Sequence, residues 1–403
     1  MSAYTLDSQQ EMLADSARNY LSRRTTQKHH VNLADRQGDE AARWAEMAGL
    51  GWLALPIPEA FGGLSGSMAD LCALAEELGR GVVNEPYVAS VVLAGMLLAD
   101  VAPQTVRDEW LPALADGSRR LALAAWEPGA RSDWTEVNTT ATQDGADWRL
   151  DGNKVLVLGG TGADGLLVSA NISGSSDFAL FLLPAGGPGQ RLVAQILFDG
   201  QGAAELTMHA ATGPTLLCQG ERSEVLGHLE VALDRATLAH CADTVGAMAR
   251  AFAITREYLG TRSQFGKPIA ANQVVQHRLV DVFVEIEEAR SLVRMTASLY
   301  DGGGSGKTAE KRRHVAATKA FVAQVARHVW EESVQLHGAI GMTQEYEVGA
   351  YVKRLALAVN LYGDASFHLE RVACSSLDST EMHALNGEKS VTAKHPKETA
   401  SEK

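Results

Sequence analysis

The feature that most restricts the fold of this sequence is its hydrophobic periodicity, which changes from helical to strand-like and back again along the chain. Apolar residues recur at helical spacing at first, then fall into short runs divided by Gly, Asp and Asn, and finally return to helical spacing. A chain of 403 residues also exceeds the usual size of one hydrophobic core. We therefore predict an α+β protein with a helical domain over residues 1–118, an antiparallel β domain over residues 119–225 and a second helical domain over residues 226–374.

Local signals place some elements more closely. The opening segment is predicted to be a helix whose capping box consists of Ser8 and Glu11, which stand three residues apart. Residues 302–306 are predicted to be a flexible Gly-rich connection between two long helices, and residues 375–403 a disordered polar tail. Strands are expected at residues 121–125, 148–150, 155–158, 165–170 and 178–183.

Charge and composition argue against several classes of function. Lys and Arg number 36 against 49 Asp and Glu, a net charge of −13 that does not favour a nucleic-acid partner. The four cysteines form no CxxC pair and the histidines no HExxH pattern, so neither a disulfide nor a metal site is expected. No apolar stretch approaches the roughly 20 residues of a membrane span, and no signal peptide is visible. We expect a cytoplasmic protein with no membrane partner.

Two segments of the C-terminal half carry the clearest motifs. Residues 262–273 contain Arg-Ser-Gln-Phe-Gly followed by a Gln, and residues 335–346 begin with Gln and contain Gly338 and Gly341. Arginine offers a planar fork of donors that suits a pyrophosphate, and glycines let backbone N–H groups approach phosphate oxygens. Considered separately, Arg262 could be a surface ion-pair residue and the two glycines a helix break.

Together, the two segments resemble the RxxFG…Q and QxxGxxG…EY signatures of the acyl-CoA dehydrogenase family. The resemblance implies that fold, with the C-terminal domain a four-helix bundle, and FAD as the cofactor. It also implies an acyl-CoA substrate, electron-transfer flavoprotein as the electron acceptor, and a homo- or hetero-oligomer in which these segments reach the FAD of a neighbouring subunit. The residues implied in that contact are Arg262, Gln264, Phe265, Gln273, Gln335, Gly338 and Gly341.

The β region holds two looser matches. Residues 127–133 resemble the family's TEPxxGSD loop beside the flavin, with Trp126 in place of Thr and Arg131 in place of Gly. Residues 151–158 resemble the GxKxWIT strand that covers the flavin, with Leu156 in place of Trp. The resemblance implies FAD contacts from Ala125, Trp126, Ser132 and Leu158, and substrate contacts from Ser132 and Arg235. The whole pattern is most similar to the branch of pimeloyl-CoA dehydrogenase small subunits and bacterial steroid-degrading dehydrogenases.

The position of the catalytic base is the main departure from the family. Members remove the proton next to the thioester carbonyl with a carboxylate, while a hydride passes to the flavin. Counting forward from Gln335 without a gap places Tyr362 where most members have the glutamate. Other members carry it on the helix after the β domain, directly before an arginine, and the matching residue here is Asp234. Asp234 is therefore the leading candidate base and Asp364 the second, although the first could instead be a helix N-terminal aspartate or a partner of Arg235, and the second a loop cap.

Three functions are compatible with these residues. The first is an FAD-dependent dehydrogenase that introduces an α,β double bond into an acyl-CoA thioester, with a bulky, steroid-derived or carboxylated acyl group. The second is a non-catalytic partner subunit that completes the FAD site of another acyl-CoA dehydrogenase chain. The third is a flavin-bound lyase or binding protein of the same fold. The presence or absence of a working base distinguishes the first two.

Overall fold

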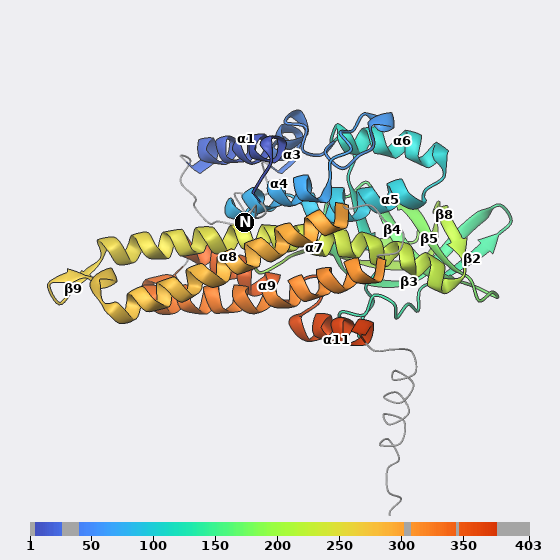
Figure 1. Cartoon of the computed structure of the whole chain (residues 1–403). Coiled ribbons are helices and arrows are strands. Elements are labelled where there is room, and N and C mark those ends of the chain that lie inside the picture. Colours follow the sequence, from blue (N-terminus) through green and yellow to red (C-terminus); the bar gives the residue numbers. More distant parts are fainter. Residues whose placement is uncertain (1–4, 26–39, 302–307, 344–345, 377–403) are drawn as a thin grey trace, which may run out of the picture.

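The computed structural model describes residues 5–25, 40–301, 308–343 and 346–376, and it confirms the predicted fold class (Figure 1). The Gly-rich connection expected at residues 302–306 lies outside the described residues, as does residue 377 onward of the tail expected at residues 375–403. The first two residues of that tail, 375 and 376, instead belong to the last helix. The N-terminal domain consists of α1 (Ser8–Thr25), α3 (Glu40–Gly49), η1 (Glu59–Phe61), α4 (Met68–Arg80), the π-helix η2 (Tyr87–Gly95), α5 (Met96–Val101) and α6 (Gln104–Ala115).

Helix α1 is present as predicted, but its capping box lies one residue earlier than expected. The carboxylate of Asp7 accepts hydrogen bonds from the N–H groups of Gln9 and Gln10, each at 2.9 Å. The side chain of Gln10 in turn accepts from the N–H of Asp7 at 3.1 Å. A capping box therefore exists, but it is centred on Asp7 rather than Ser8, because a carboxylate and an amide at this spacing satisfy the same backbone donors.

The strands form a mixed sheet rather than the antiparallel sheet that we predicted. Strands β1 and β2 each run parallel to β4, while the other pairs are antiparallel. A parallel pair needs a crossover, and the chain passes from β1 through residues 125–139 and the β2–β3 hairpin before it returns to β4. The strands are β1 (Leu121–Ala124), β2 (Thr140–Asp144), β3 (Asp147–Leu158), β4 (Gly165–Ile172), β5 (Phe178–Pro184), β6 (Gln190–Ile196), β7 (Gly202–Thr212) and β8 (Thr215–Gly220).

The two strands expected at residues 148–150 and 155–158 are one strand, β3. Its pairing with β7 shifts register twice, between Leu150 and Gly152 and between Lys154 and Val157. Such bulges insert unpaired residues and interrupt the alternation of apolar and polar side chains. That interruption explains why the sequence pattern divided one strand into two.

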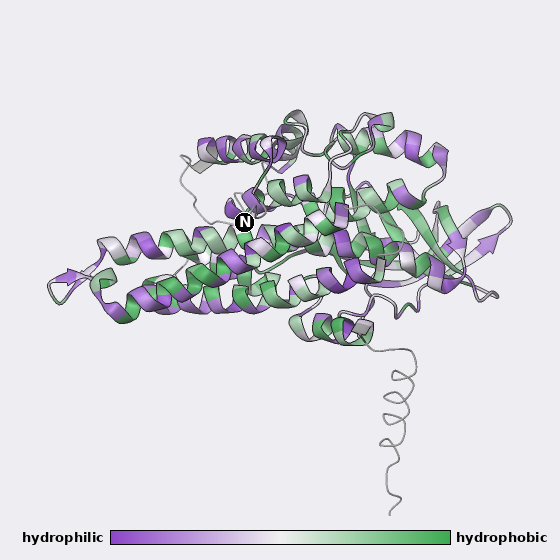
Figure 2. Ribbon diagram, in the orientation of Figure 1, coloured by the Kyte–Doolittle hydropathy of each residue, from purple (hydrophilic) through white to green (hydrophobic). Residues whose placement is uncertain are grey.

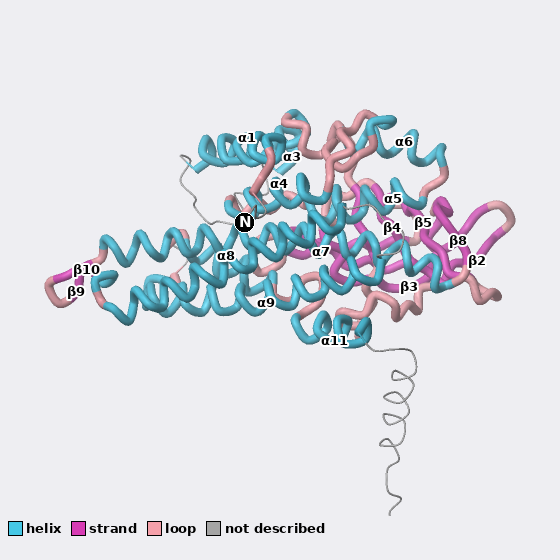
Figure 3. Tube along the Cα trace, viewed as in Figure 1, coloured by secondary structure: helices cyan, strands magenta, loops and turns pink. Residues whose placement is uncertain are grey.

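Long helices build the C-terminal domain and extend away from the sheet (Figure 3). Helix α7 alone has 40 residues, a length of about 60 Å. Figure 2 shows the central strands to be largely hydrophobic and the β9 hairpin, at the far end of the helices, hydrophilic. No helix among the described residues is both long and apolar enough to cross a membrane. The elements are α7 (Arg222–Thr261), β9 (Ser263–Gln264), β10 (Lys267–Pro268), η3 (Ile269–Ala271), α8 (Gln273–Asp301), α9 (Thr308–His337), η4 (Gly338–Met342), α10 (Val348–Ala358) and α11 (Ala365–Ser376).

Candidate functional site

The loop that follows β1 is fastened to strand β3. The N–H of Val155 donates to the carbonyl of Trp126 at 2.8 Å. Directly beside this contact, Glu127 and Lys154 form an ion pair at 2.8 Å, with side chains that are 4% and 0% exposed. The Glu127 carboxylate also accepts from the hydroxyl of Thr139 at 2.6 Å.

The pKa values of this pair follow from its burial and its partners. Burial alone would raise the pKa of Glu127, but the charge and hydrogen bond of Lys154, with the further bonds to the carboxylate, bring it to about 2. Burial lowers the pKa of Lys154 to about 8, against the opposing effect of Glu127. Both groups are therefore charged at neutral pH, and their attraction holds the loop that carries Trp126 in place.

Three departures from the family's motifs, Arg131, Leu156 and Tyr362, have a positive φ, which non-glycine residues rarely adopt. Arg131, where the family has glycine, has a φ of 52°. Glycine enters this left-handed region without steric cost, whereas other residues lose about 1–2 kcal/mol. The loop thus keeps a conformation that suits the family's glycine although the side chain is an arginine.

Trp126 and Tyr362, two of the departures from the motifs, contact each other. Their ring centroids lie 6.5 Å apart at an interplanar angle of 67°. The imidazole of His240, on α7, lies 5.2 Å from the Tyr362 ring. We call these three residues the aromatic cluster. It joins the β-domain loop, helix α7 and the turn that follows α10.

The other expected flavin contacts of the β domain lie near this cluster or in the same loop. Ala125 directly precedes Trp126 and is fully buried. Leu158, at the end of β3, packs in a small core with Ala89 and Leu361. Ser132 lies further along the loop and is half-buried.

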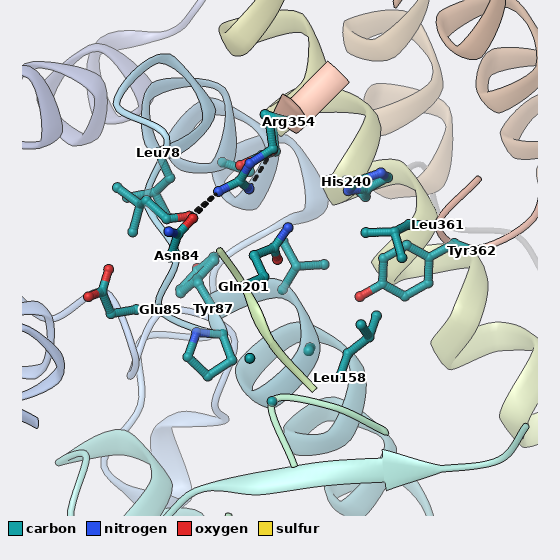
Figure 4. Close-up of a pocket in the computed structure, with 18 residues that line it drawn as sticks. Leu78, Asn84, Glu85, Tyr87, Leu158, Gln201, His240, Arg354, Leu361 and Tyr362 are labelled. Atoms are coloured by element: carbon teal, nitrogen blue, oxygen red, sulfur yellow. Dashed lines mark hydrogen bonds and ion pairs between the residues drawn. The ribbon is translucent and has the colours of Figure 1, made fainter. Parts of the chain in front are cut away.

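A cavity of about 30 Å³ lies beside the aromatic cluster (Figure 4). This volume admits about two water molecules, whereas pockets for small-molecule ligands usually measure roughly 300–1,000 Å³. Figure 4 shows Tyr362 with its hydroxyl turned toward the space between the lining residues. The polar residues of the wall are Asn84, Glu85, Tyr87, Gln201, His240, Asp243, Arg354 and Tyr362.

Arg354, on α10, connects all three domains behind this cavity. Its guanidinium is 3% exposed and lies 2.9 Å from the carboxylate of Asp199 and 3.3 Å from that of Asp243. It also donates to the carbonyl of Val83 and the side-chain oxygen of Asn84, each at 2.7 Å. Burial raises the pKa of Asp243 to about 6, against the opposing charge of Arg354.

Of the polar residues of this wall, the sequence analysis singled out only Tyr362; those it missed include His240, Asp243 and Arg354. The sequence held a signal for His240 and Asp243, since these two polar residues stand three positions apart in a predicted helix and such residues share one face. Arg354 carried no signal, since it is a lone arginine in an amphipathic helix.

Asp234, the expected base, does not line the cavity. Asp234 and Asp243 are nine positions apart on α7, which corresponds to about two and a half helical turns. The two side chains therefore lie on opposite faces of the helix. Asp234 is 2% exposed and accepts from Arg371, on α11, at 3.0 Å. Burial raises the pKa of Asp234 to about 6, against the charge and hydrogen bond of Arg371.

The alternatives considered for Asp234 and Asp364 have different outcomes. Asp234 lies well inside α7 rather than at its N-terminus. Its neighbour Arg235 pairs instead with Asp100, at 2.5 Å. The carboxylate of Asp364 accepts from the N–H of Phe367 at 2.8 Å, so Asp364 caps the first turn of α11.

The two C-terminal motifs come together at the opposite end of α7. The side chains of Arg262, Gln264, Phe265, Gln273 and Gln335 are all exposed there, and Phe265 is 99% exposed on the β9–β10 hairpin. The hydroxyl of Tyr258, one turn before Arg262, donates to the carbonyl of His337 at 3.3 Å, which brings the hairpin next to the start of η4.

The glycines of η4 allow this compact arrangement. Gly338 has a φ of 66°, and a Cβ on Gly341 would lie 2.9 Å from the Cβ of His337. Gly341 is buried, whereas Gly338 is exposed. A guanidinium, several amides and the backbone of Gly338, exposed at one place, form a donor set that fits the phosphates of FAD.

One chain cannot use both groups of expected FAD contacts on the same cofactor. His240, in the aromatic cluster, and Arg262, at the hairpin, are separated by about 30 Å of α7. Figure 1 shows the hairpin and the β domain at opposite ends of the molecule. The exposed hairpin residues therefore face outward from this chain, where they can contact a molecule that another chain binds.

Comparisons with known proteins agree on one family. The acyl-CoA dehydrogenase N-terminal domain model matches residues 7–118, and the C-terminal domain model matches residues 228–377. Acyl-CoA dehydrogenase FadE12 of Mycobacterium tuberculosis is 29% identical over 340 residues, which cover 82% of this chain and 86% of the relative.

Two solved structures extend the similarity to hetero-oligomeric enzymes. A variant of the Tcur3481-Tcur3483 steroid ACAD is 30% identical with a TM-score of 0.78, and the match covers 93% of this chain and 98% of that one. A chain of the ChsE4-ChsE5 complex from Mycobacterium tuberculosis is 25% identical with a TM-score of 0.79, covering 92% and 97%.

Proposed function

The chain belongs to the acyl-CoA dehydrogenase family of FAD-dependent oxidoreductases, and we propose that it acts there as a partner subunit. In this role it completes the FAD site of a second acyl-CoA dehydrogenase chain and leaves proton abstraction to a carboxylate of that chain. FAD, when bound, accepts the hydride. The residues of this chain that would hold its phosphates are Arg262, Gln264, Gln273 and Gln335.

The aromatic cluster is the observation that carries the proposal. At the position where most members have the glutamate, this chain has Tyr362, and its ring packs against Trp126. The adjoining cavity has about 30 Å³, which is too small for an acyl chain. Tyr362 supplies no carboxylate at the family's position, and the cavity beside it has no room for an acyl chain.

The exposed hairpin supports the other half of the proposal. Phe265 is 99% exposed, and burying such a side chain contributes about 1.5–3 kcal/mol. A contact with a second chain would bury it and bring Arg262 to that chain's cofactor. The similarity to the ChsE4-ChsE5 complex and to the Tcur3481-Tcur3483 steroid ACAD supports a hetero-oligomer and a bulky, steroid-derived acyl group. We further propose electron-transfer flavoprotein as the acceptor.

An active dehydrogenase is the second candidate, and two buried carboxylates favour it. Burial raises the pKa of both Asp234 and Asp243 to about 6, near the working range of a general base. Asp243 lines the cavity, whereas Asp234 has the position expected from the sequence. Both are engaged by arginines, Asp234 by Arg371 and Asp243 by Arg354, which weakens this candidate.

Anaerobic flavin reduction by a panel of acyl-CoA thioesters separates the two candidates. The chain is purified alone and together with any acyl-CoA dehydrogenase chain that copurifies with it, and FAD per chain is measured from the absorption spectrum. A partner subunit gives no flavin reduction alone and reduction only in the complex. Reduction by the unaccompanied protein would refute the partner role.

Two variants extend this experiment. In the complex, Asp234→Asn and Asp243→Asn are expected to leave flavin reduction intact, because the base belongs to the other chain. Loss of reduction with retained FAD, for either variant, would transfer the role of base to that residue.

A further inference from the structure

The wall of the small cavity contains two polar groups without a hydrogen-bond partner among the described residues. They are the hydroxyl of Tyr87 and the side-chain nitrogen of Asn84. Tyr87 is 2% exposed, so bulk water does not reach it. A buried polar group that lacks a partner is costly, and native proteins rarely leave one so.

The orientation of Asn84 is fixed by its other contact. Arg354 donates to the side-chain oxygen of Asn84 at 2.7 Å, and a guanidinium has only donors. The amide oxygen must therefore face Arg354, as Figure 4 shows, and the NH₂ group is left as a donor without a partner. The carboxylate of Asp243, which binds Arg354 through Oδ1, adds an acceptor to the same wall.

We infer that this cavity is an internal hydration site that holds about two ordered water molecules. Its volume of about 30 Å³ suits that number, since one water needs roughly 10–15 Å³ of such space. For such waters the wall offers a donor on Asn84, a hydroxyl on Tyr87 that both donates and accepts, and an acceptor on Asp243. The inference is independent of which chain supplies the catalytic base.

Hydration changes what the site can accept. An alkyl chain that entered here would displace waters bound to buried polar groups and leave those groups unpaired. The cavity therefore selects against a plain alkyl group, for a reason that is separate from the bulk of Tyr362.

The sign of one mutational effect tests the inference. If the Tyr87 hydroxyl binds water, Tyr87→Phe removes a satisfied group, and the folding equilibrium constant falls about fivefold. If the cavity is dry, the same change removes an unsatisfied group, and the constant is unchanged or rises, which overturns the inference. Tyr351→Phe is the matched control, because the hydroxyl of Tyr351 is buried and donates to the carbonyl of Arg80 at 2.8 Å.

A high-resolution crystal structure of the wild-type protein, in its complex if it has one, gives the second test. Ordered water peaks within hydrogen-bond distance of both Tyr87 and Asn84 are expected. An empty cavity at a resolution that shows other internal waters would contradict the proposal, even if the variant does not fold.

Discussion

Removing the charge of Glu127 is expected to destabilise the protein by about 3–4 kcal/mol at neutral pH. The pKa of Glu127 falls from 4.5 to about 2 in the folded state, and each pKa unit corresponds to about 1.4 kcal/mol of stability. Glu127→Gln keeps the shape of the side chain but leaves Lys154, which is fully buried, without its counter-charge. Losing one partner of a buried pair typically costs about 3–5 kcal/mol, in agreement with this value.

The pH dependence has a definite sign. Because the folded pKa of Glu127 lies below the unfolded value, its contribution is complete above pH 4.5 and is lost as the pH falls toward 2. The difference in free energy of unfolding between wild type and Glu127→Gln should therefore be largest near pH 7 and shrink below pH 4.5. Urea denaturation at a series of pH values, followed by tryptophan fluorescence, measures it.

Two further variants make the experiment decisive. Adding Lys154→Met to Glu127→Gln should recover much of the loss, because the unpaired buried charge is then gone. Asp144→Asn breaks an exposed ion pair with Arg149. The side chains of Asp144 and Arg149 are 59% and 50% exposed, so this change should cost less than about 1 kcal/mol. The reasoning is refuted if Glu127→Gln costs no more than this surface control.

Other predictions concern the hairpin and the strained loop. Arg262→Ala should weaken FAD retention by about one to two powers of ten, because charge-assisted hydrogen bonds are worth about 1.5–3 kcal/mol; unchanged FAD content after dialysis of the complex would make Arg262 an ordinary surface residue. Phe265→Ala should leave the unfolding of the isolated chain unchanged, since the side chain is 99% exposed, but should weaken association with the partner chain about tenfold or more in analytical ultracentrifugation. Arg131→Gly should raise the free energy of unfolding by up to about 1 kcal/mol by relieving the left-handed conformation, and a loss of stability in urea would show that the arginine side chain makes a compensating contact.

The fold could be predicted from the sequence because its signals are local. Helical and strand periodicity identified the order of the domains, and the Arg262 and Gly338 motifs, each a short run of residues, indicated the family. The parallel pairing of β1 with β4 could not be predicted, since it depends on a crossover through residues 125–139 that no local pattern encodes. The prediction of Asp234 rested on its position before Arg235, but the face of a helix on which a residue lies depends on how the helix packs, and packing turns Asp234 toward α11.

The contact between Trp126 and Tyr362 shows what the sequence could not supply. Each is a single departure from a motif when considered alone, and a single departure is weak evidence that a site has lost its chemistry. In the structure their rings meet, so a large side chain on the loop and a large side chain in place of the glutamate fill one space together. Restoring only the glutamate would place a carboxylate beside Trp126, whereas restoring only the threonine would leave a cavity beside Tyr362, at a cost of about 3–5 kcal/mol for the lost indole. The two residues are therefore coupled, and that coupling favours a chain in which this space serves packing rather than catalysis.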